Sequence, residues 1–114
     1  MSHLVPRVTS KLLAGIRDRI VESFRPHRIV LFGSHAYGKP HPWSDVDLLV
    51  VMPSRERMAR RIMRVARTAH VPFLPMDVLL FTPEEIRSRL VTGDPFIRNV
   101  LSRGKVLYQR GKGR

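Results

Sequence analysis

Apolar residues follow two spacings along the chain, and the alternation between them predicts alternating helices and strands. Apolar side chains three or four positions apart indicate amphipathic helices, whereas a continuous run such as Leu48 to Val51 is typical of a strand buried on both faces. The segment Thr82-Pro83-Glu84-Glu85 has the pattern of a helix start. The predicted helices cover residues 9–24, 54–70, 83–92 and 95–103, with one helical turn at 34–37, and the predicted strands cover residues 28–32, 45–52, 76–81 and 105–109.

This order of elements predicts an α/β or α+β fold, in which one mixed sheet of about four strands packs against flanking helices. The length of 114 residues suits a single domain over residues 1–114, without an internal repeat. Residues 1–8 precede the first predicted helix and contain Leu4-Val5-Pro6-Arg7, which resembles the remnant of a thrombin-cleavage tag but is equally a native segment. We expect residues 1–8 to be disordered or tag-derived, and residues 110–114 to form a basic tail.

Composition narrows the classes of function. The chain has no cysteine, which excludes disulfide scaffolds, iron–sulfur clusters, thiolate zinc sites and thiol nucleophiles. Its longest apolar run, Leu48 to Met52, is far shorter than a membrane span, and no apolar signal-peptide core stands near the start, so we expect a cytoplasmic protein without a membrane partner. The formal net charge of +12 favours nucleotides, RNA or an acidic protein as partners, although an arginine-rich genome would also produce it.

The residues that are candidates for binding and catalysis begin directly after the predicted strand 28–32. Gly33 and Ser34 start a helical turn, where backbone N–H groups favour an anion and glycine lets a phosphate approach the backbone. Asp45 and Asp47 stand two positions apart at the start of the next strand, so their side chains share one side of it. Two carboxylates that close repel each other unless a cation lies between them, and oxygen ligands select Mg²⁺ or Mn²⁺.

A third carboxylate, Asp77, lies at the start of the predicted strand 76–81, among apolar residues. An aspartate buried there without a partner would be costly, so a metal ion or a cation is expected beside it. If this strand neighbours the strand of Asp45 and Asp47, the three carboxylates form the kind of cluster that two-metal nucleotidyl transfer needs.

The combination of Gly33-Ser34, ten intervening residues, Asp45-x-Asp47 and a downstream Asp77 resembles the DNA polymerase β nucleotidyltransferase superfamily. It is most similar to the stand-alone minimal nucleotidyltransferases (the MNT family), and the resemblance covers nearly the whole chain. It implies a polymerase β-like palm that binds the phosphates of ATP through Gly33 and Ser34. It also implies that Asp45 and Asp47 bind both metal ions, and that Asp77 is the third ligand and helps to activate the attacking hydroxyl.

One position departs from the family pattern. Many members carry an arginine where Tyr37 stands. If that arginine holds the triphosphate, this chain must use another cation or bind the nucleotide more weakly. Lys39 is the nearest cation in sequence and therefore joins Gly33 and Ser34 as a candidate for nucleotide binding.

Minimal nucleotidyltransferases are the small partners of HEPN-domain proteins. The resemblance therefore implies transfer of AMP to a hydroxyl, with a tyrosine of a HEPN toxin as the acceptor and the toxin neutralised. The chain lacks the additional domains with which polymerases grip a primer, so a separate protein substrate or a homo-oligomer must complete the site. The alternatives are a non-catalytic antitoxin or nucleotide-binding partner that acts by complex formation, and nucleotidylation of a small molecule. The intact carboxylates favour the enzyme.

Several other residues receive simpler interpretations. The arginines from Arg57 to Arg67 are interpreted as a solvated helix face, with direct RNA binding as the competing interpretation. Trp43 lies beside the predicted site and is a candidate contact for a partner. His35, His41 and His70 lack any spacing typical of zinc ligands and are interpreted as surface histidines.

Overall fold

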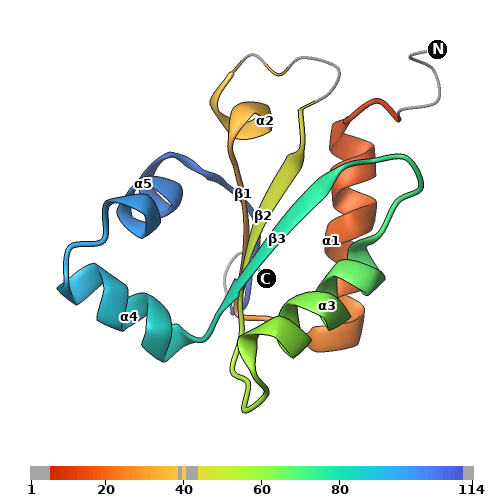
Figure 1. Cartoon of the computed structure of the whole chain (residues 1–114). Coiled ribbons are helices and arrows are strands. Elements are labelled where there is room, and N and C mark those ends of the chain that lie inside the picture. Colours follow the sequence, from red (N-terminus) through yellow and green to blue (C-terminus); the bar gives the residue numbers. More distant parts are fainter. Residues whose placement is uncertain (1–5, 39, 41–43, 112–114) are drawn as a thin grey trace.

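The computed structural model describes residues 6–38, 40 and 44–111, so the predictions for Lys39, His41 and Trp43 lie outside the described residues. Each predicted helix and strand is present, and most of their ends agree within one or two residues (Figure 1). No helix in the described part of the chain is both long and apolar enough to cross a membrane. In chain order the elements are α1 (Ser10–Phe24), β1 (Arg28–Phe32), α2 (Ser34–Tyr37), β2 (Val46–Val51), α3 (Met58–Ala69), β3 (Met76–Phe81), α4 (Pro83–Val91), α5 (Pro95–Arg103) and β4 (Lys105–Gln109).

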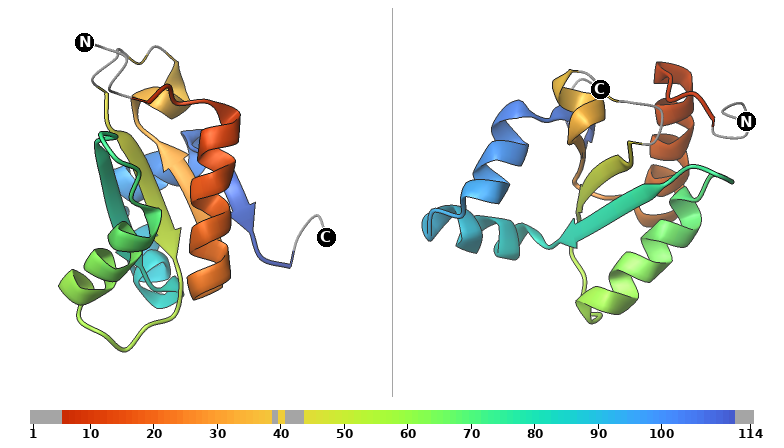
Figure 2. Two further views of the ribbon diagram at one scale, coloured as in Figure 1. Left: turned by 90° about the vertical axis from the view of Figure 1, so that its right-hand side faces the viewer. Right: turned by 45° about the horizontal axis from the view of Figure 1, so that its top comes forward.

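The strands of the described chain form one mixed sheet in the order β3-β2-β1-β4, as the alternation of elements predicts. The central strand β1 pairs antiparallel with β2 and with β4, whereas β2 and β3 are parallel and are connected through α3. Figures 1 and 2 show α1 and α3 against one face of the sheet and α4 and α5 against the other. The fold is therefore a sheet with helices on both faces.

Side chains alternate along the strands and so divide the buried residues into two cores. One core lies between the sheet and the pair α1 and α3, where Ile16, Ile20 and Val65 are fully buried. The other lies between the sheet and the pair α4 and α5, where Ile97 and Val100 are buried. Burying one such side chain completely contributes about 1.5–3 kcal/mol relative to leaving it exposed.

Capping side chains set the starts of two helices. The hydroxyl of Thr9 accepts a hydrogen bond from the N–H of Leu12 at 3.1 Å, which satisfies a donor in the first turn of α1. Thr82 and Glu85 form the predicted capping box of α4: the Thr82 hydroxyl accepts from the Glu85 N–H at 3.1 Å, and the Glu85 carboxylate accepts from the Thr82 N–H at 2.8 Å. The predicted start of α4 is therefore confirmed, and a side-chain cap also sets the start of α1.

The predicted start of α3 near Ser54 is wrong, because α3 begins only at Met58. The Ser54 hydroxyl accepts a hydrogen bond from the N–H of Glu56, two residues on, at 3.1 Å. That bond forms a local turn instead of a helix cap. The backbone remains extended at Arg57, the residue before the helix, which makes no capping bond through its side chain.

The solvated arginine face predicted on α3 is wrong at Arg61, which is only 5% exposed. Arg61 lies one turn before Val65 and two turns before Ala69, so it shares their buried stripe. Its guanidinium bonds to the Glu85 carboxylate of α4 at 3.2 Å and thus ties the helices on the two faces of the sheet together. The other arginines of this stretch are exposed: Arg57, Arg60, Arg64 and Arg67.

Candidate active site

The candidate site begins where β1 ends at Phe32 and the backbone turns sharply at Gly33. Gly33 has a φ of 75° and forms the N-cap of the short helix α2. Its carbonyl accepts hydrogen bonds from the N–H groups of Ala36 and Tyr37, both at 3.0 Å. A Cβ added to Gly33 would overlap the carboxylate of Asp47. Glycine is therefore required twice here, by the positive φ and by the close approach of this carboxylate.

Strand pairing brings the predicted carboxylates to one end of the sheet. Asp47 on β2 is the register partner of Asp77 on β3, its parallel neighbour, and also of Phe32 on β1. Neighbouring strands lie about 4.8 Å apart, so Asp47 and Asp77 are adjacent on the face that α4 and α5 cover. Asp45 directly precedes β2, two residues from Asp47, and its negative charge acts on the Asp47 carboxyl. The predicted neighbourhood of the two aspartate strands is confirmed.

The electrostatics of Asp47 show that these carboxylates act on one another. Burial raises the pKa of Asp47 above its ordinary value of 3.8, and the negative charges of Asp77 and then Asp45 raise this pKa further. The nearby His35 has the opposite, smaller effect on the Asp47 pKa. A cation bound beside Asp47 would relieve the repulsion that raises the pKa of this carboxyl.

His35 belongs to this site, although its sequence context indicates a surface histidine. Its side chain is partly buried, and its Nε2 lies 3.1 Å from the backbone carbonyl of Ser44. This contact connects α2 to the residue just before Asp45. The position of His35 directly after Gly33-Ser34 is the one sequence feature that indicates a place in the site. Its contact with Ser44 could not be predicted, because the two residues are nine positions apart. His70 is exposed, as predicted.

The donor set of the three carboxylates fits a hard divalent ion, because every ligand atom it offers is an oxygen. Asp45 and Asp77 are exposed and Asp47 is partly buried, so the carboxylates can be reached from solvent. Within residues 6–38, 40 and 44–111, no three or more His, Asp or Glu side chains stand in an arrangement that could already hold a metal ion. Asp47 and Asp77 are thus register partners, and the charges of Asp77 and Asp45 act on Asp47. To bind an ion, the three side chains would have to turn toward it.

Two residues of α5 flank the site and were missed by sequence reasoning. The guanidinium of Arg103 lies 4.5 Å from the ring centroid of Tyr37, the last residue of α2. The ring of Phe96 meets the ring of Phe32 edge to face, with centroids 5.6 Å apart, and Phe96 remains 43% exposed. Phe32 is the register partner of Asp47. One face of α5 therefore packs against α2 at Tyr37 and against β1 at Phe32.

Comparison with known proteins agrees with this geometry. A chain of Methanocaldococcus jannaschii that bears the name "putative protein adenylyltransferase" is 27% identical over 111 residues, covering 88% of this chain and 74% of that one. The crystal structure of a "putative nucleotidyltransferase" from Sulfolobus solfataricus matches with a TM-score of 0.62 and 21% identity, over 90% of this chain and 82% of that one. The latter match shows the shared fold.

The model of the nucleotidyltransferase domain matches residues 13–107, which include Gly33, Ser34 and all three aspartates. Members of this family generally use a nucleoside triphosphate and a divalent metal ion. The chain belongs to the nucleotidyltransferase domain family and is an enzyme that transfers nucleotidyl groups.

Proposed function

We propose that this enzyme transfers AMP from ATP, with Mg²⁺ as the divalent ion, to a tyrosine hydroxyl of a HEPN toxin and thereby neutralises the toxin. The observation that carries the proposal is the meeting of Asp47 and Asp77 across β2 and β3, beside the backbone of Gly33. A protein that neutralises its partner by binding alone needs no cluster of mutually repelling carboxylates. The name of the Methanocaldococcus relative supports adenylyl transfer to a protein.

The residues of the site divide the work of the reaction. The first N–H groups of α2 lack intrahelical acceptors, so together with the Ser34 hydroxyl they donate hydrogen bonds to the triphosphate. Asp45 and Asp47 would hold both metal ions, and Asp77 would be the third ligand, beside the acceptor hydroxyl. When bound, these ions lower the pKa of the acceptor hydroxyl and neutralise charge on the leaving group.

The transfer exchanges one phosphorus–oxygen bond for another. The acceptor oxygen attacks the α-phosphorus of ATP, and the bond from this phosphorus to the oxygen bridging the β-phosphate breaks, so that pyrophosphate leaves. The proton of the acceptor hydroxyl passes to Asp77 and from there to solvent. Asp77 suits this role because it is exposed and lies on β3, the edge strand of the sheet, which a second protein can approach.

Arg103 takes the role that an arginine at position 37 would have in other members of the family. Its guanidinium stacks on Tyr37 at the end of α2, so its charge stands near the position from which an arginine side chain is missing. Arg103 is exposed, and none of the ion pairs in the described part of the chain involves it. It is therefore available to the β- and γ-phosphates of the nucleotide.

The proposal is tested by incubating the enzyme with ATP, Mg²⁺ and a HEPN-domain protein encoded beside it, and by weighing the HEPN protein in a mass spectrometer. The expected result is the mass of one or more adenylyl groups on a tyrosine, absent with Asp47→Asn and absent without a divalent ion. An unmodified HEPN protein that the Asp47→Asn variant still neutralises would refute the enzymatic role and leave complex formation as the mechanism. Adenylylation of small hydroxyl compounds alone would replace the protein acceptor with a small molecule.

A further inference from the structure

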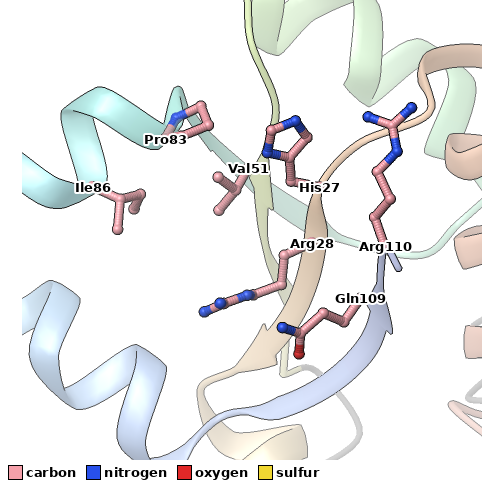
Figure 3. A pocket seen from close by; sticks show the side chains of 7 residues that line it. All are labelled: His27, Arg28, Val51, Pro83, Ile86, Gln109 and Arg110. Carbon is pink, nitrogen blue, oxygen red and sulfur yellow. The ribbon is translucent and has the colours of Figure 1, made fainter. Parts of the chain in front are cut away.

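A cavity of about 330 Å³ opens at the end of the sheet opposite to the carboxylates (Figure 3). Its floor is a row across three strands: Arg28 on β1 is the register partner of Val51 on β2 and of Gln109 on β4. The carboxylate row crosses the same strands at Phe32 and Asp47, four residues farther along β1. Four residues of strand span about 13 Å, so the cavity is separate from the candidate active site.

The lining of the cavity combines cations with an apolar wall. Pro83 and Ile86, on the first turns of α4, form the wall together with Val51. In Figure 3 Arg28 extends toward the α4 side of the cavity, whereas His27 and Arg110 lie on the opposite side. No acidic residue lines the cavity, and its volume falls in the range of sites for small molecules.

The sheet holds the backbone of the basic residues in this cavity, whereas their side chains are not paired within the described part of the chain. The His27 N–H donates to the Val51 carbonyl at 2.8 Å, and the Arg110 N–H donates to the His27 carbonyl at 2.9 Å, which fixes the backbone of both residues. Among the described residues, no side-chain hydrogen bond or ion pair involves Arg28, Arg110 or the ring of His27. Glu85, a partly buried acid in the first turn of α4, is already bonded to Arg61 and to the backbone N–H of Thr82. Its carboxylate is therefore engaged away from the basic residues of the cavity.

These observations point to one kind of ligand. An unpaired guanidinium on a rigid strand matches the geometry of a phosphate or carboxylate, and the second guanidinium and the imidazole on the other side favour a doubly charged group. The apolar wall of Val51, Pro83 and Ile86 favours a flat, apolar body attached to that group. Gln109 adds an amide at the floor that can both donate and accept hydrogen bonds.

We propose that this cavity is a second ligand site, distinct from the carboxylates, which binds a small phosphate monoester with an aromatic body. The phosphate lies against Arg28, with Arg110 and His27 on the opposite side of the cavity, and the ring lies on Pro83 and Ile86. A nucleoside monophosphate belongs to this chemical class.

The test follows AMP binding to the full-length protein by NMR, at 150 mM salt and without divalent ions, so that weak attraction to the overall positive charge is screened. The expected result is a set of shifted amide signals at Arg28, Val51 and Gln109. Phenyl phosphate should shift the same signals, whereas adenosine should not, and inorganic phosphate should bind at least fivefold more weakly than AMP.

Four variants separate this site from the others. Arg28→Gln and, independently, the surface substitution Arg110→Gln should weaken AMP binding by about tenfold or more. Arg60→Gln removes the same charge from the exposed face of α3 and should change the affinity less than twofold. Asp47→Asn should leave AMP binding at the cavity unchanged, so this result is independent of whether the proposed transfer reaction occurs.

Three outcomes would overturn the inference. The first is an absence of AMP-induced shifts at the cavity when AMP is added to millimolar protein up to a 10-fold excess. Binding that escapes detection at roughly this concentration would be too weak to define a specific site. The second is equal weakening by Arg60→Gln and Arg28→Gln, which would reduce the effect to general charge. The third is equal binding of inorganic phosphate and AMP, which would show that the apolar wall contributes nothing.

Discussion

The two ends of the sheet use the same strands for opposite purposes. At one end, β1 and β2 bring Asp47 beside Asp77 and the bare backbone of Gly33. At the other end, the same two strands bring Arg28 beside Val51, with the start of α4 packed over them. At the acidic end, the negative charges of Asp77 and Asp45 oppose the ionisation of Asp47. At the basic end, a capping box and the bond from Arg61 to Glu85 fix the start of α4. The acidic end is thus organised for chemistry, whereas the basic end combines a fixed helix start with a cavity lined by basic side chains.

This comparison predicts that changes at the acidic end abolish activity without unfolding the protein. Asp47→Asn should lower the rate of adenylyl transfer by about 10²–10³-fold or more, because it removes a charge that both metal ions need. Its melting temperature should equal or slightly exceed that of the wild type, because the repulsion from Asp77 and Asp45 is relieved. Radiolabel transfer from ATP and a thermal melt check both parts, and transfer at the wild-type rate would contradict the assignment of Asp47.

Gly33→Ala should damage both activity and stability, since it places a methyl group against the Asp47 carboxylate at a positive φ. We expect a loss of about 1–3 kcal/mol of unfolding free energy and at least a tenfold loss of transfer. Gly93→Ala is the matched control, because Gly93 also has a positive φ (79°) but has open space around it, with the nearest atom at 3.8 Å. Urea titrations in which the two variants lose equal stability would show that the overlap with Asp47 has no effect.

At the basic end the expected effect is reversed. Arg61→Ala should lower the free energy of unfolding by about 1–3 kcal/mol while leaving the turnover of the folded enzyme unchanged. The lower half of this range is favoured because the Glu85 side chain is 37% exposed, so that solvent screens the pair. Arg60→Ala, on the exposed side of the same helix, is the control and should change the stability by less than about 0.5 kcal/mol. A loss of turnover in Arg61→Ala beyond its unfolded fraction would break the proposed division between the two ends.

Arg103→Gln should have a smaller effect, limited to the binding of ATP. We expect the KM for ATP to rise by about five- to tenfold, which corresponds to about 1–1.4 kcal/mol, with little change in kcat. Arg98→Gln removes a neighbouring exposed charge on α5 and serves as the control. An unchanged KM in Arg103→Gln would leave Tyr37 without a cation that replaces the family's arginine.

The smallest effect concerns the pH dependence of stability. Because the folded state raises the pKa of Asp47, this residue favours folding below its ordinary value of 3.8, and the contribution is lost as the pH rises through the folded-state pKa. Asp47→Asn should therefore gain stability relative to the wild type as the pH increases from about 3 to 7. Glu85 acts in the opposite direction: Arg61 first and Thr82 next lower its pKa, so its contribution is present above its ordinary value of 4.5 and lost as the pH falls. Thermal melts of Asp47→Asn and of Glu85→Gln across this pH range would measure how each difference from the wild type changes with pH. Slopes of equal sign would contradict the comparison.

The sequence predicted the parts of this molecule that depend on neighbouring residues. The capping box of Thr82 and Glu85 and the turn at Gly33 are local patterns, and the structure confirms them. The start of α3 was mispredicted because Ser54 has two local options, a cap or a tight turn, and propensity does not separate them.

The parts that could not be predicted depend on contacts between distant segments. Arg61 was assigned to solvent because its partner, Glu85, lies on another helix across the sheet. Arg103 and Phe96 join the site only because α5 returns to α2 and β1. The three aspartates were recognised by their spacing, but their adjacency rests on the parallel register of β2 with β3, which spacing alone leaves open.

The place of β4 in the sheet has a consequence for the order in which the molecule is completed during synthesis. β4 follows the other strands of the described chain, yet it pairs with β1, one of the two inner strands of the sheet. Until the ribosome has released β4, one edge of β1 has no partner and can pair with other chains. Gly33, Asp47 and Asp77 are all in place by the end of β3, whereas the basic cavity needs Gln109 and Arg110. The strands that carry the aspartates are therefore synthesised before the residues that complete the cavity.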